Sequence, residues 1–361
     1  MRYVRFLKTP RITTEKGTNK SSVYCLINIT SDLGDSTLPY DASLVAELIS
    51  PERDFQGDEV LVERSLEWTA EMRTLAVTLP LKQWHTSGPL RVRVGVHSKA
   101  HFDTFEELCN PESHGIVSAW SAEFNSKGNK EAVKLVERRF KIANRTIKVW
   151  EETGESIARH LWDAGITLSC QITQLTTSKQ SELAKALGFS SRILNSTLGV
   201  LELGTGCGIV GMTLAALLPN CQVTLTDLPE AQEIVERNIS GLSTDLRNGS
   251  SLAFEELNWD AELPAWLLQS RTKTELVLAS DCTYNSDSSP ALVNTLRRLA
   301  DANRKIVVGI AMKMRHDSEL VFFDLMNDAG FEETALLDWS LPGDVNLGED
   351  KVYLHVYHLT S

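Results

Sequence analysis

The chain has 361 residues, of which 42% are hydrophobic and 23% are charged, and its formal net charge at pH 7 is −12. This length predicts two domains, and the composition is sufficient for a sizeable buried core. The acidic balance, without a dense Lys/Arg cluster, argues against a nucleic-acid partner, and no apolar run reaches membrane-spanning length.

Six cysteines are scattered through the sequence and none forms a C-x-x-C pair, and the histidines have no ligand spacing either. This pattern predicts no metal site and is typical of a protein whose thiols stay reduced. The first residues contain no apolar signal-peptide core. We therefore expect the chain in the cytoplasm, or in the nucleus as well, without a membrane partner. We also expect a monomer.

The first third of the chain carries strand signals and few helical ones. Short β-branched runs, separated by turn-forming residues, occupy residues 22–30, 43–49, 73–81 and 90–97. In the last run, Val92 and Val94 alternate with Arg91 and Arg93, which predicts a strand with an apolar face and a solvated charged face. Strands at this spacing predict an all-β, sandwich-like domain over residues 1–125.

Residues 126–146 are polar and charged, and we interpret them as a connector that is helical in part. Strand-like and helix-like segments then alternate, at residues 197–203, 209–218, 221–227, 229–239, 275–281, 289–302, 304–312 and 318–330. This alternation predicts βαβ units in a doubly wound α/β domain over residues 147–361. Two more strands, 331–339 and 351–359, follow without an intervening helix, so we expect a seven-stranded sheet whose last strand is antiparallel.

A glycine-rich stretch follows the first strand of this second domain, and it fits two fingerprints. Counted from Gly206 it reads G-x-G-x-x-G, the dinucleotide pattern. Counted from Glu202 it reads E-x-G-x-G-x-G, the pattern of a loop that holds S-adenosylmethionine. Asp227 ends the next strand, where both cofactor classes place a carboxylate for the ribose hydroxyls, so it does not separate them.

Glu202 separates the two cofactors better, because it lies directly before the loop. A dinucleotide would bring a pyrophosphate to that point, and an adjacent anion would repel it. S-adenosylmethionine brings an ammonium and a sulfonium group instead, for which a carboxylate is favourable. The sequence therefore favours S-adenosylmethionine, and a nicotinamide cofactor stays as a remote alternative that one titration would exclude.

The fourth strand of the domain ends in SDCTYN, which contains Asp281 and Tyr284. In a doubly wound sheet, ligands bind at the carboxyl ends of the central strands. We therefore expect these two side chains beside the ligand of the glycine loop.

Four segments, in this order, resemble the seven-β-strand, class I methyltransferases of the Asp-x-x-Tyr group (methyltransferase family 16), which act on lysines of proteins. The segments are LWDAGITLS, LELGTGCGIVGM, TLTDLPEAQEIVERNI and SDCTYN, and LNWD at 257–260 resembles the family's Trp-containing turn. Gly165 is a departure, because the family more often has Ala there. The resemblance covers residues 147–361, and the β-rich first third resembles only the N-terminal extensions of some fungal members.

The resemblance implies a Rossmann-like methyltransferase fold and gives roles to individual residues. Asp281 and Tyr284 would be the catalytic residues. The cofactor-binding residues would be Trp162, Glu202, Gly204, Thr205, Gly206, Gly208, Asp227, Leu228, Trp259 and Ser280. The substrate would be a protein that bears the target lysine, such as a translation factor or a chaperone.

Methyl transfer to an amine requires the amine to be neutral. A free lysine has a pKa of about 10.4, so its deprotonation near pH 7 costs roughly 4–5 kcal/mol, and a neighbouring sulfonium lowers this cost by repulsion. Asp281 would orient the nitrogen by accepting a hydrogen bond, and Tyr284 would offer an aromatic face or a hydroxyl.

Two other functions remain as alternatives at this point. One is methylation of a small molecule; methylation of bases or glutamine amides is disfavoured, because Cys282 and Thr283 stand where those enzymes have prolines. The other is an interaction module without activity, against which the intact glycine loop and Asp281 argue. For residues 1–125 we weigh two roles equally, docking of the protein substrate and a stabilising cover of the catalytic domain.

Overall fold

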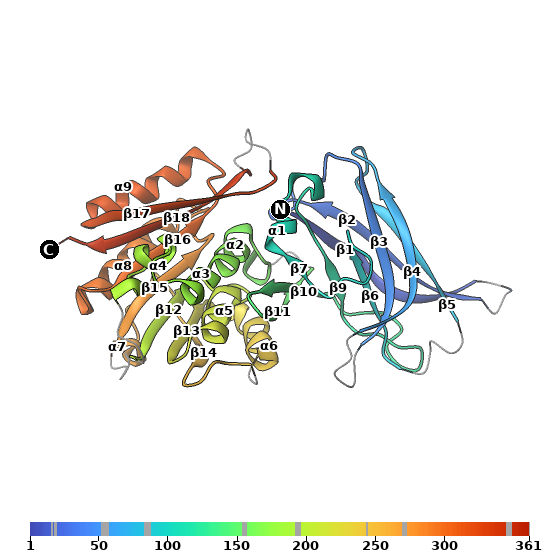
Figure 1. The fold of residues 1–361 in the computed structure, drawn as a ribbon, viewed down its shortest axis with the longest axis horizontal. Coiled ribbons are helices and arrows are strands. Elements are labelled where there is room, and N and C mark those ends of the chain that lie inside the picture. Colours follow the sequence, from blue (N-terminus) through green and yellow to red (C-terminus); the bar gives the residue numbers. More distant parts are fainter. Residues whose placement is uncertain are drawn as a thin grey trace. The chain divides into compact units, whose positions relative to one another are not determined.

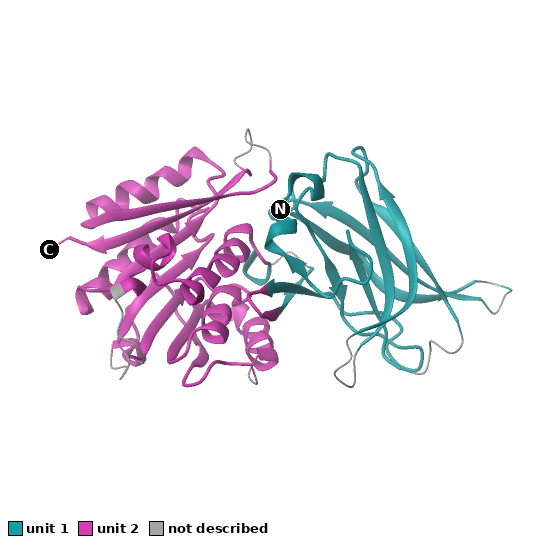
Figure 2. Cartoon of the chain, viewed as in Figure 1, with its two compact units in different colours: residues 1–141, 148–160 teal, residues 142–147, 161–361 magenta. Residues whose placement is uncertain are grey.

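The structure is a computed structural model that describes residues 1–15, 17, 20–51, 58–82, 88–153, 157–191, 196–242, 245–268, 273–343 and 349–360. The chain divides into two compact units (Figure 2). Unit 1 comprises residues 1–141 and 148–160, and unit 2 comprises residues 142–147 and 161–361.

Unit 1 is built almost entirely of strands (Figure 1). Among its described residues, one sheet has the order β5-β2-β1-β8, with β5 (Leu75–Leu81), β2 (Ser21–Thr30), β1 (Arg2–Thr14) and β8 (Ile116–Val117). A second sheet has the order β11-β10-β9-β6-β3-β4, with β11 (Arg145–Glu152), β10 (Leu135–Ile142), β9 (Ala119–Ser121), β6 (Arg91–Gly95), β3 (Ala42–Ser50) and β4 (Glu59–Trp68). A short strand β7 (Asp103–Thr104) pairs with β10 and leads into helix α1 (Phe105–Leu108).

The two sheets of unit 1 share one hydrophobic core. Alternate residues of β2 and β5, such as Ile27 and Leu79, meet residues of the second sheet, such as Leu48 and Val94, in a single buried cluster. Period-two alternation places these side chains on the inner face of each sheet. The strand-rich N-terminal region that the sequence predicts is therefore present.

The charged face of β6 is buried, so the prediction of a solvated face was wrong. Arg93 Nη1 lies 2.8 Å from Glu47 Oε2, and Arg91 Nη1 lies 3.2 Å from Glu137 Oε2. All four side chains are at most 6% exposed, and Arg93 lies over the Trp120 ring, 5.2 Å from its centroid. Alternation predicted which residues share a face, but other strands of the sheet, β3 and β10, supply the opposite charges that allow this face to be buried.

The partly helical connector predicted over residues 126–146 was also wrong in its secondary structure. Residues 135–142 form β10, which pairs antiparallel with β9. The charges of this segment suggested solvent exposure, but Glu137 and Arg139 are both buried and form an ion pair with each other. Charge by itself therefore did not distinguish an exposed helix from a strand with paired buried charges.

In the described part of unit 2, seven strands form one mixed sheet of order β14-β13-β12-β15-β16-β18-β17. They are β12 (Leu198–Leu203), β13 (Cys221–Asp227), β14 (Ser251–Glu256), β15 (Thr274–Ser280), β16 (Val307–Met312), β17 (Phe331–Ser340) and β18 (Lys351–Leu359). The central pairs are parallel, while β18 is antiparallel to both β16 and β17. The mixed sheet predicted from the alternating segments is therefore present.

Helices cover both faces of this sheet (Figure 1). On one face, α7 (Ala265–Leu268), α8 (Ser289–Ala302) and α9 (Val321–Asp328) pack against Leu203, Val277 and Ile310. On the other, α5 (Ile209–Leu217) places Gly211 against Val223 of β13. The other α-helices in the described part of this unit are α2 (Asp163–Gln171), α3 (Thr173–Thr177), α4 (Glu182–Ala186) and α6 (Gln232–Leu242).

The parallel strands bring their carboxyl ends to one edge of the sheet. Asp227 ends β13, Ser280 ends β15 and Met312 ends β16, so the segments that follow them gather at this edge. We call it the carboxyl edge. In the parts of the chain that the structure describes, no helix is long and apolar enough to cross a membrane.

Candidate active site

The loop between β12 and α5 turns through glycines with left-handed backbone. The angle φ is +58° at Gly204, +56° at Gly206 and +86° at Gly208, a conformation that residues with a Cβ rarely adopt. Thr205 N donates to Thr226 O over 2.9 Å, and Gly208 N donates to Thr205 O over 2.8 Å. The first bond fixes the loop against the end of β13, and the second closes a turn within the loop.

Two other segments pack directly on this loop. A Cβ at Gly204 would lie 2.6 Å from Cys282 Sγ and 3.2 Å from the ring of Trp259, so a larger residue here would have to displace the Cys282 side chain. Cys282 Sγ lies 3.7 Å from Gly204 O, within hydrogen-bond distance for sulfur. The structure therefore brings the glycine loop, the Trp259 turn and the loop after β15 together, although they are far apart in the sequence.

Glu202 lies beneath the loop and is 1% exposed. Its Oε2 accepts a hydrogen bond of 2.7 Å from Gly211 N and so holds the first turn of α5. Its other oxygen, Oε1, is buried, and the Thr205 side chain interacts with the carboxyl group. A buried carboxyl group of this kind fits a positively charged ligand, such as one with an ammonium group.

The charge of Glu202 depends on pH in the neutral range. Burial raises its pKa to about 8, and the nearby charge of Asp227 acts in the same direction. At pH 7 the ligand-free carboxyl is therefore largely neutral, and it would repel a pyrophosphate less than the sequence argument assumed. A cation beside Oε1 would favour the ionised form, so the site suits a positively charged ligand whose binding releases a proton.

Asp227 joins the end of β13 to the glycine loop. Its Oδ2 accepts a hydrogen bond of 2.8 Å from Gly206 N, and its Oδ1 accepts one of 2.8 Å from Leu228 N. Burial raises the pKa of this carboxyl. The Leu228 side chain is 39% exposed beside it, so an apolar surface adjoins the carboxylate.

Asp281 is bound within the protein at both carboxylate oxygens. Its Oδ2 accepts a hydrogen bond of 2.8 Å from Ala164 N in the first turn of α2, and its Oδ1 lies 2.9 Å from Arg315 Nη1. The side chain is 2% exposed. The backbone has φ +54°, a strained value for a residue with a Cβ, and Asp281 N donates to Ala311 O over 2.8 Å.

Tyr284, in contrast, is 46% exposed and is the open member of the D-x-x-Y pair. Because the rest of the Tyr284 side chain is buried, the pKa of its hydroxyl is raised. Thr283 between them is fully buried. Ser280 is half-buried, and a Cβ at Gly165 would lie 3.5 Å from its Oγ, so the alanine common at position 165 would make only ordinary contacts.

Trp162 is the N-cap residue of α2, with extended backbone and no side-chain cap hydrogen bond. The guanidinium of Arg315 lies over its ring, 5.8 Å from the centroid. Lys313 Nζ forms an ion pair of 2.8 Å with Asp163 Oδ2, and both side chains are at most 2% exposed.

Sequence reasoning gave no role to Asp163, Lys313 or Arg315. A signal was available for the two cations, because they directly follow β16. The rule that drew attention to Asp281, position after the carboxyl end of a parallel strand, also applies to them.

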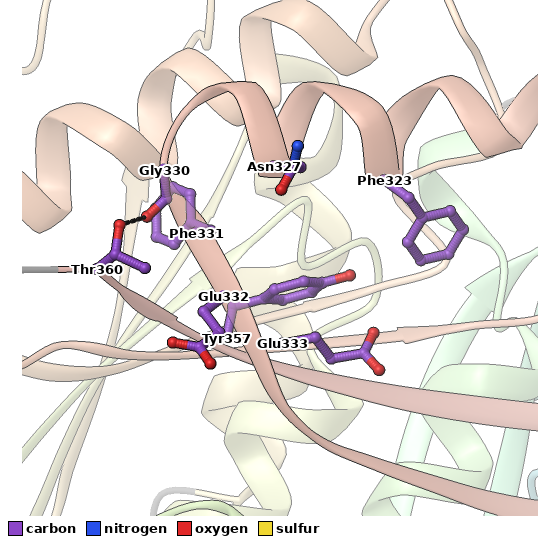
Figure 3. Close-up of a pocket in the computed structure, with 8 residues that line it drawn as sticks. All are labelled: Phe323, Asn327, Gly330, Phe331, Glu332, Glu333, Tyr357 and Thr360. Atoms are coloured by element: carbon purple, nitrogen blue, oxygen red, sulfur yellow. Dashed lines mark hydrogen bonds between the residues drawn. The ribbon is translucent and has the colours of Figure 1, made fainter.

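A separate groove of about 400 Å³ lies between α9 and the strands β17 and β18 (Figure 3). Its lining includes Glu332, Glu333 and Tyr357 but none of the predicted site residues. The groove adjoins the start of β17, which runs parallel to β12, so it lies away from the carboxyl edge. Over the ranges that the structure describes, no group of three or more His, Cys, Asp or Glu residues could hold a metal ion.

Comparison with known proteins places this site in a family. Residues 141–329 match the lysine methyltransferase family. A UPF0665 family protein of Schizosaccharomyces pombe is 27% identical over 325 residues, which cover 89% of this chain and 91% of the relative. Mouse protein N-lysine methyltransferase METTL21A is 28% identical over 186 residues, 50% of this chain and 74% of the relative. Mouse EEF1A lysine methyltransferase 3 is 32% identical over 127 residues, 35% of this chain and 51% of the relative.

The family match extends over more than half of the chain and includes the glycine loop, Asp227 and the loop with Asp281 and Tyr284. Those are the segments that the structure brings together at the carboxyl edge. The chain belongs to the lysine methyltransferase family and is an enzyme that transfers methyl groups from S-adenosylmethionine to lysine side chains of proteins.

Proposed function

We propose that methyl transfer takes place at the carboxyl edge of the unit 2 sheet, with the cofactor on the glycine loop and the substrate lysine beside Tyr284. One observation carries this proposal: Cys282 Sγ lies 3.7 Å from Gly204 O, so the loop after β15 rests on the glycine loop. A cofactor held by one loop would therefore lie next to residues of the other.

The residues around the glycine loop suit S-adenosylmethionine. The charge of Glu202 would attract the ammonium group, Asp227 would bind the ribose hydroxyls, and the Trp259 ring would flank the adenine. Trp162, Thr205, Leu228 and Ser280 would complete the cofactor site. When bound, the cofactor supplies an electrophilic methyl group on a sulfonium.

Tyr284 is the residue that we place against the substrate lysine, because its side chain is 46% exposed. Its hydroxyl stays protonated at neutral pH, since burial raises an already high pKa. The ring offers an aromatic face to the methylated, cationic product.

Asp281 has an indirect role in this proposal, unlike the hydrogen bond to the lysine nitrogen that the sequence suggested. Its side chain is 2% exposed and its oxygens already accept from Ala164 N and Arg315 Nη1. The ion pair with Arg315 also offsets its charge, so the carboxylate would do little to stabilise the lysine ammonium form. This matters because neutralising a lysine at pH 7 already costs roughly 4–5 kcal/mol.

We propose a translation factor as the substrate to test first, with a chaperone as the second choice. Two relatives are named EEF1A lysine methyltransferase 3, and these names support testing a translation factor first. The net charge of −12 favours a basic surface on the partner. The chain would act as a monomer in the cytoplasm, or in the nucleus as well, without nucleic acid.

The test is incubation of the purified protein with methyl-labelled S-adenosylmethionine and an extract of cells that lack this enzyme. We expect one labelled protein band that yields methyl-lysine on hydrolysis. The matched control is Gly206→Arg, which forces a long side chain with a Cβ onto a backbone of φ +56°. It should remove both the label and binding of S-adenosylhomocysteine.

Two outcomes would contradict the proposal. Label in a small molecule but in no protein would contradict the protein substrate. Calorimetry that shows binding of NAD and no heat with S-adenosylhomocysteine would contradict the cofactor site.

A further inference from the structure

The segment that follows β16 contacts Asp281 and Trp162 of the proposed site, and Thr283 between Asp281 and Tyr284. This segment, residues 313–319, carries Lys313, Arg315 and Glu319. Lys313 and Glu319 are each 1% exposed, and the Arg315 side chain is 6% exposed. Buried charges of this kind are costly to desolvate, so their arrangement calls for a reason beyond stability.

Arg315 joins two residues of the proposed site that have no sequence proximity. Its Nη1 donates to Asp281 Oδ1 over 2.9 Å, and its guanidinium lies over the Trp162 ring, 5.8 Å from the centroid. The same Nη1 also reaches Lys313 O at 3.3 Å, which orients the arginine within its own segment. One side chain therefore sets the position of the carboxylate and of the ring together.

The first turn of α2 is held by the loop after β15 and by the segment after β16. Asp281 Oδ2 accepts from Ala164 N, and Lys313 Nζ pairs with Asp163 Oδ2. The N-cap residue Trp162 has no side-chain cap of its own. The cap is thus supplied by a residue 117 positions away in the sequence.

Glu319 connects the segment to the D-x-x-Y loop itself. Its Oε1 accepts from Arg315 N over 2.9 Å and from His316 N over 3.1 Å. Its Oε2 lies 3.4 Å from Thr283 Oγ1, directly before Tyr284. The contacts form a closed ring through α2, the loop after β15 and the segment after β16.

We infer that Arg315 is a positioning residue for methyl transfer, which holds Asp281 and Trp162 in the arrangement that the bound cofactor and the lysine require. This inference rests on the proposed function. Asp281 keeps a backbone φ of +54°, and such strain persists only where surrounding contacts hold it in place. Arg315 supplies the charged contact that holds Asp281 in this conformation. Lys313 supports the arrangement by fixing the first turn of α2.

The test compares Arg315→Lys and Arg315→Gln with the unchanged full-length chain. The methyl label is transferred to the proteins of the cell extract, which is added in excess, while the S-adenosylmethionine concentration is varied. The initial rates give an apparent kcat and a KM for the cofactor. Lysine keeps the charge but presents one nitrogen, whereas a guanidinium presents a planar fork. We expect Arg315→Lys to lower kcat about tenfold and Arg315→Gln about 100-fold, because small misplacements of reacting groups carry penalties of this size. KM should change less than kcat.

The matched control is Arg304→Gln. Arg304 precedes β16 at the other end of the strand, is 59% exposed and pairs with Asp301. It should leave kcat, KM and the circular dichroism spectrum unchanged.

The inference is overturned if both Arg315 variants keep kcat within about twofold, or if activity falls only in proportion to the folded fraction. If Arg315→Gln does not fold, the change of kcat against KM in Arg315→Lys decides alone. An unchanged chain that labels no protein and binds no S-adenosylhomocysteine overturns the proposed function instead, so the two failures are distinguishable.

Discussion

Glu202 links the proposed cofactor site to pH, because burial raises its pKa to about 8 from an ordinary 4.5. Between these values the folded state keeps a proton that the unfolded state has lost. The free energy of unfolding therefore falls as pH rises from 5 to 8, by up to about 1.4 kcal/mol per pH unit from this residue. Urea unfolding at several pH values measures the slope, and Glu202→Gln should make it shallower. Equal slopes in both proteins would contradict the assignment.

Binding of the cofactor should be coupled to the same proton. S-adenosylmethionine brings positive charge toward Glu202, which favours the ionised carboxyl, so we expect proton release on binding at pH 7. Calorimetric titrations in two buffers of different ionisation enthalpy measure the number of protons released. The unchanged chain should release a fraction of a proton that Glu202→Gln does not. A binding enthalpy that is independent of the buffer would show that Glu202 does not face the cation.

At the scale of the element, β6 shows how a strand can bury charge on one face. Arg93 and Glu47 are each 1% exposed and lie 2.8 Å apart. Arg93→Leu would leave the Glu47 carboxylate without this partner, and we expect a loss of about 3–5 kcal/mol in the free energy of unfolding of unit 1. Urea unfolding followed by tryptophan fluorescence measures it.

Two further variants separate this ion-pair effect from simple truncation. The double variant Glu47→Leu with Arg93→Leu leaves no unpaired charge and should be less destabilised than Arg93→Leu alone. Arg73→Leu, at an exposed position of the same unit, should stay within about 0.5 kcal/mol of the unchanged chain. A double variant as unstable as the single one would show that packing, not charge pairing, dominates at β6.

At the scale of the whole molecule, we predict that the two units divide the work between cofactor and substrate. The deletion must respect the sheet of unit 1, because β10 and β11 lie beyond residue 125 and β10 pairs with β9. A chain that begins at residue 157 keeps every described strand of the unit 2 sheet, although it lacks residues 142–147 of that unit. We expect the shortened chain to bind S-adenosylhomocysteine as the full chain does. Its methylation of the whole protein substrate should fall by about tenfold or more, which corresponds to a loss of roughly 1.4 kcal/mol of docking free energy.

A peptide that bears the target lysine is the control for this deletion, since a short peptide would not use the surface of unit 1. Its methylation should be affected less than that of the whole protein. If the shortened chain aggregates, or binds S-adenosylhomocysteine weakly, unit 1 acts as a stabilising cover and not as a docking surface.

The sequence by itself determined those features that depend on neighbours along the chain. Apolar periodicity predicted α8 at residues 289–302, where the structure has it, and identified the strands of the mixed sheet. The glycines before α5 and the carboxylate at the end of β13 were identifiable because a tight turn and a strand end are local events. The family also followed from such local segments, because their order along the chain is preserved.

Only the tertiary structure decided which charges are buried and what they bind. The alternating pattern predicts that Arg93 is solvated, but its side chain forms an ion pair with Glu47 of another strand. Asp281 accepts a hydrogen bond from the start of a helix 117 positions earlier in the chain. The cost of burying a charge depends on the partner it finds, and periodicity carries no information about a partner from a distant segment. For the same reason the sequence could mark Arg315 only by its position after a strand, and its contacts with Asp281 and the Trp162 ring were decided by the tertiary structure.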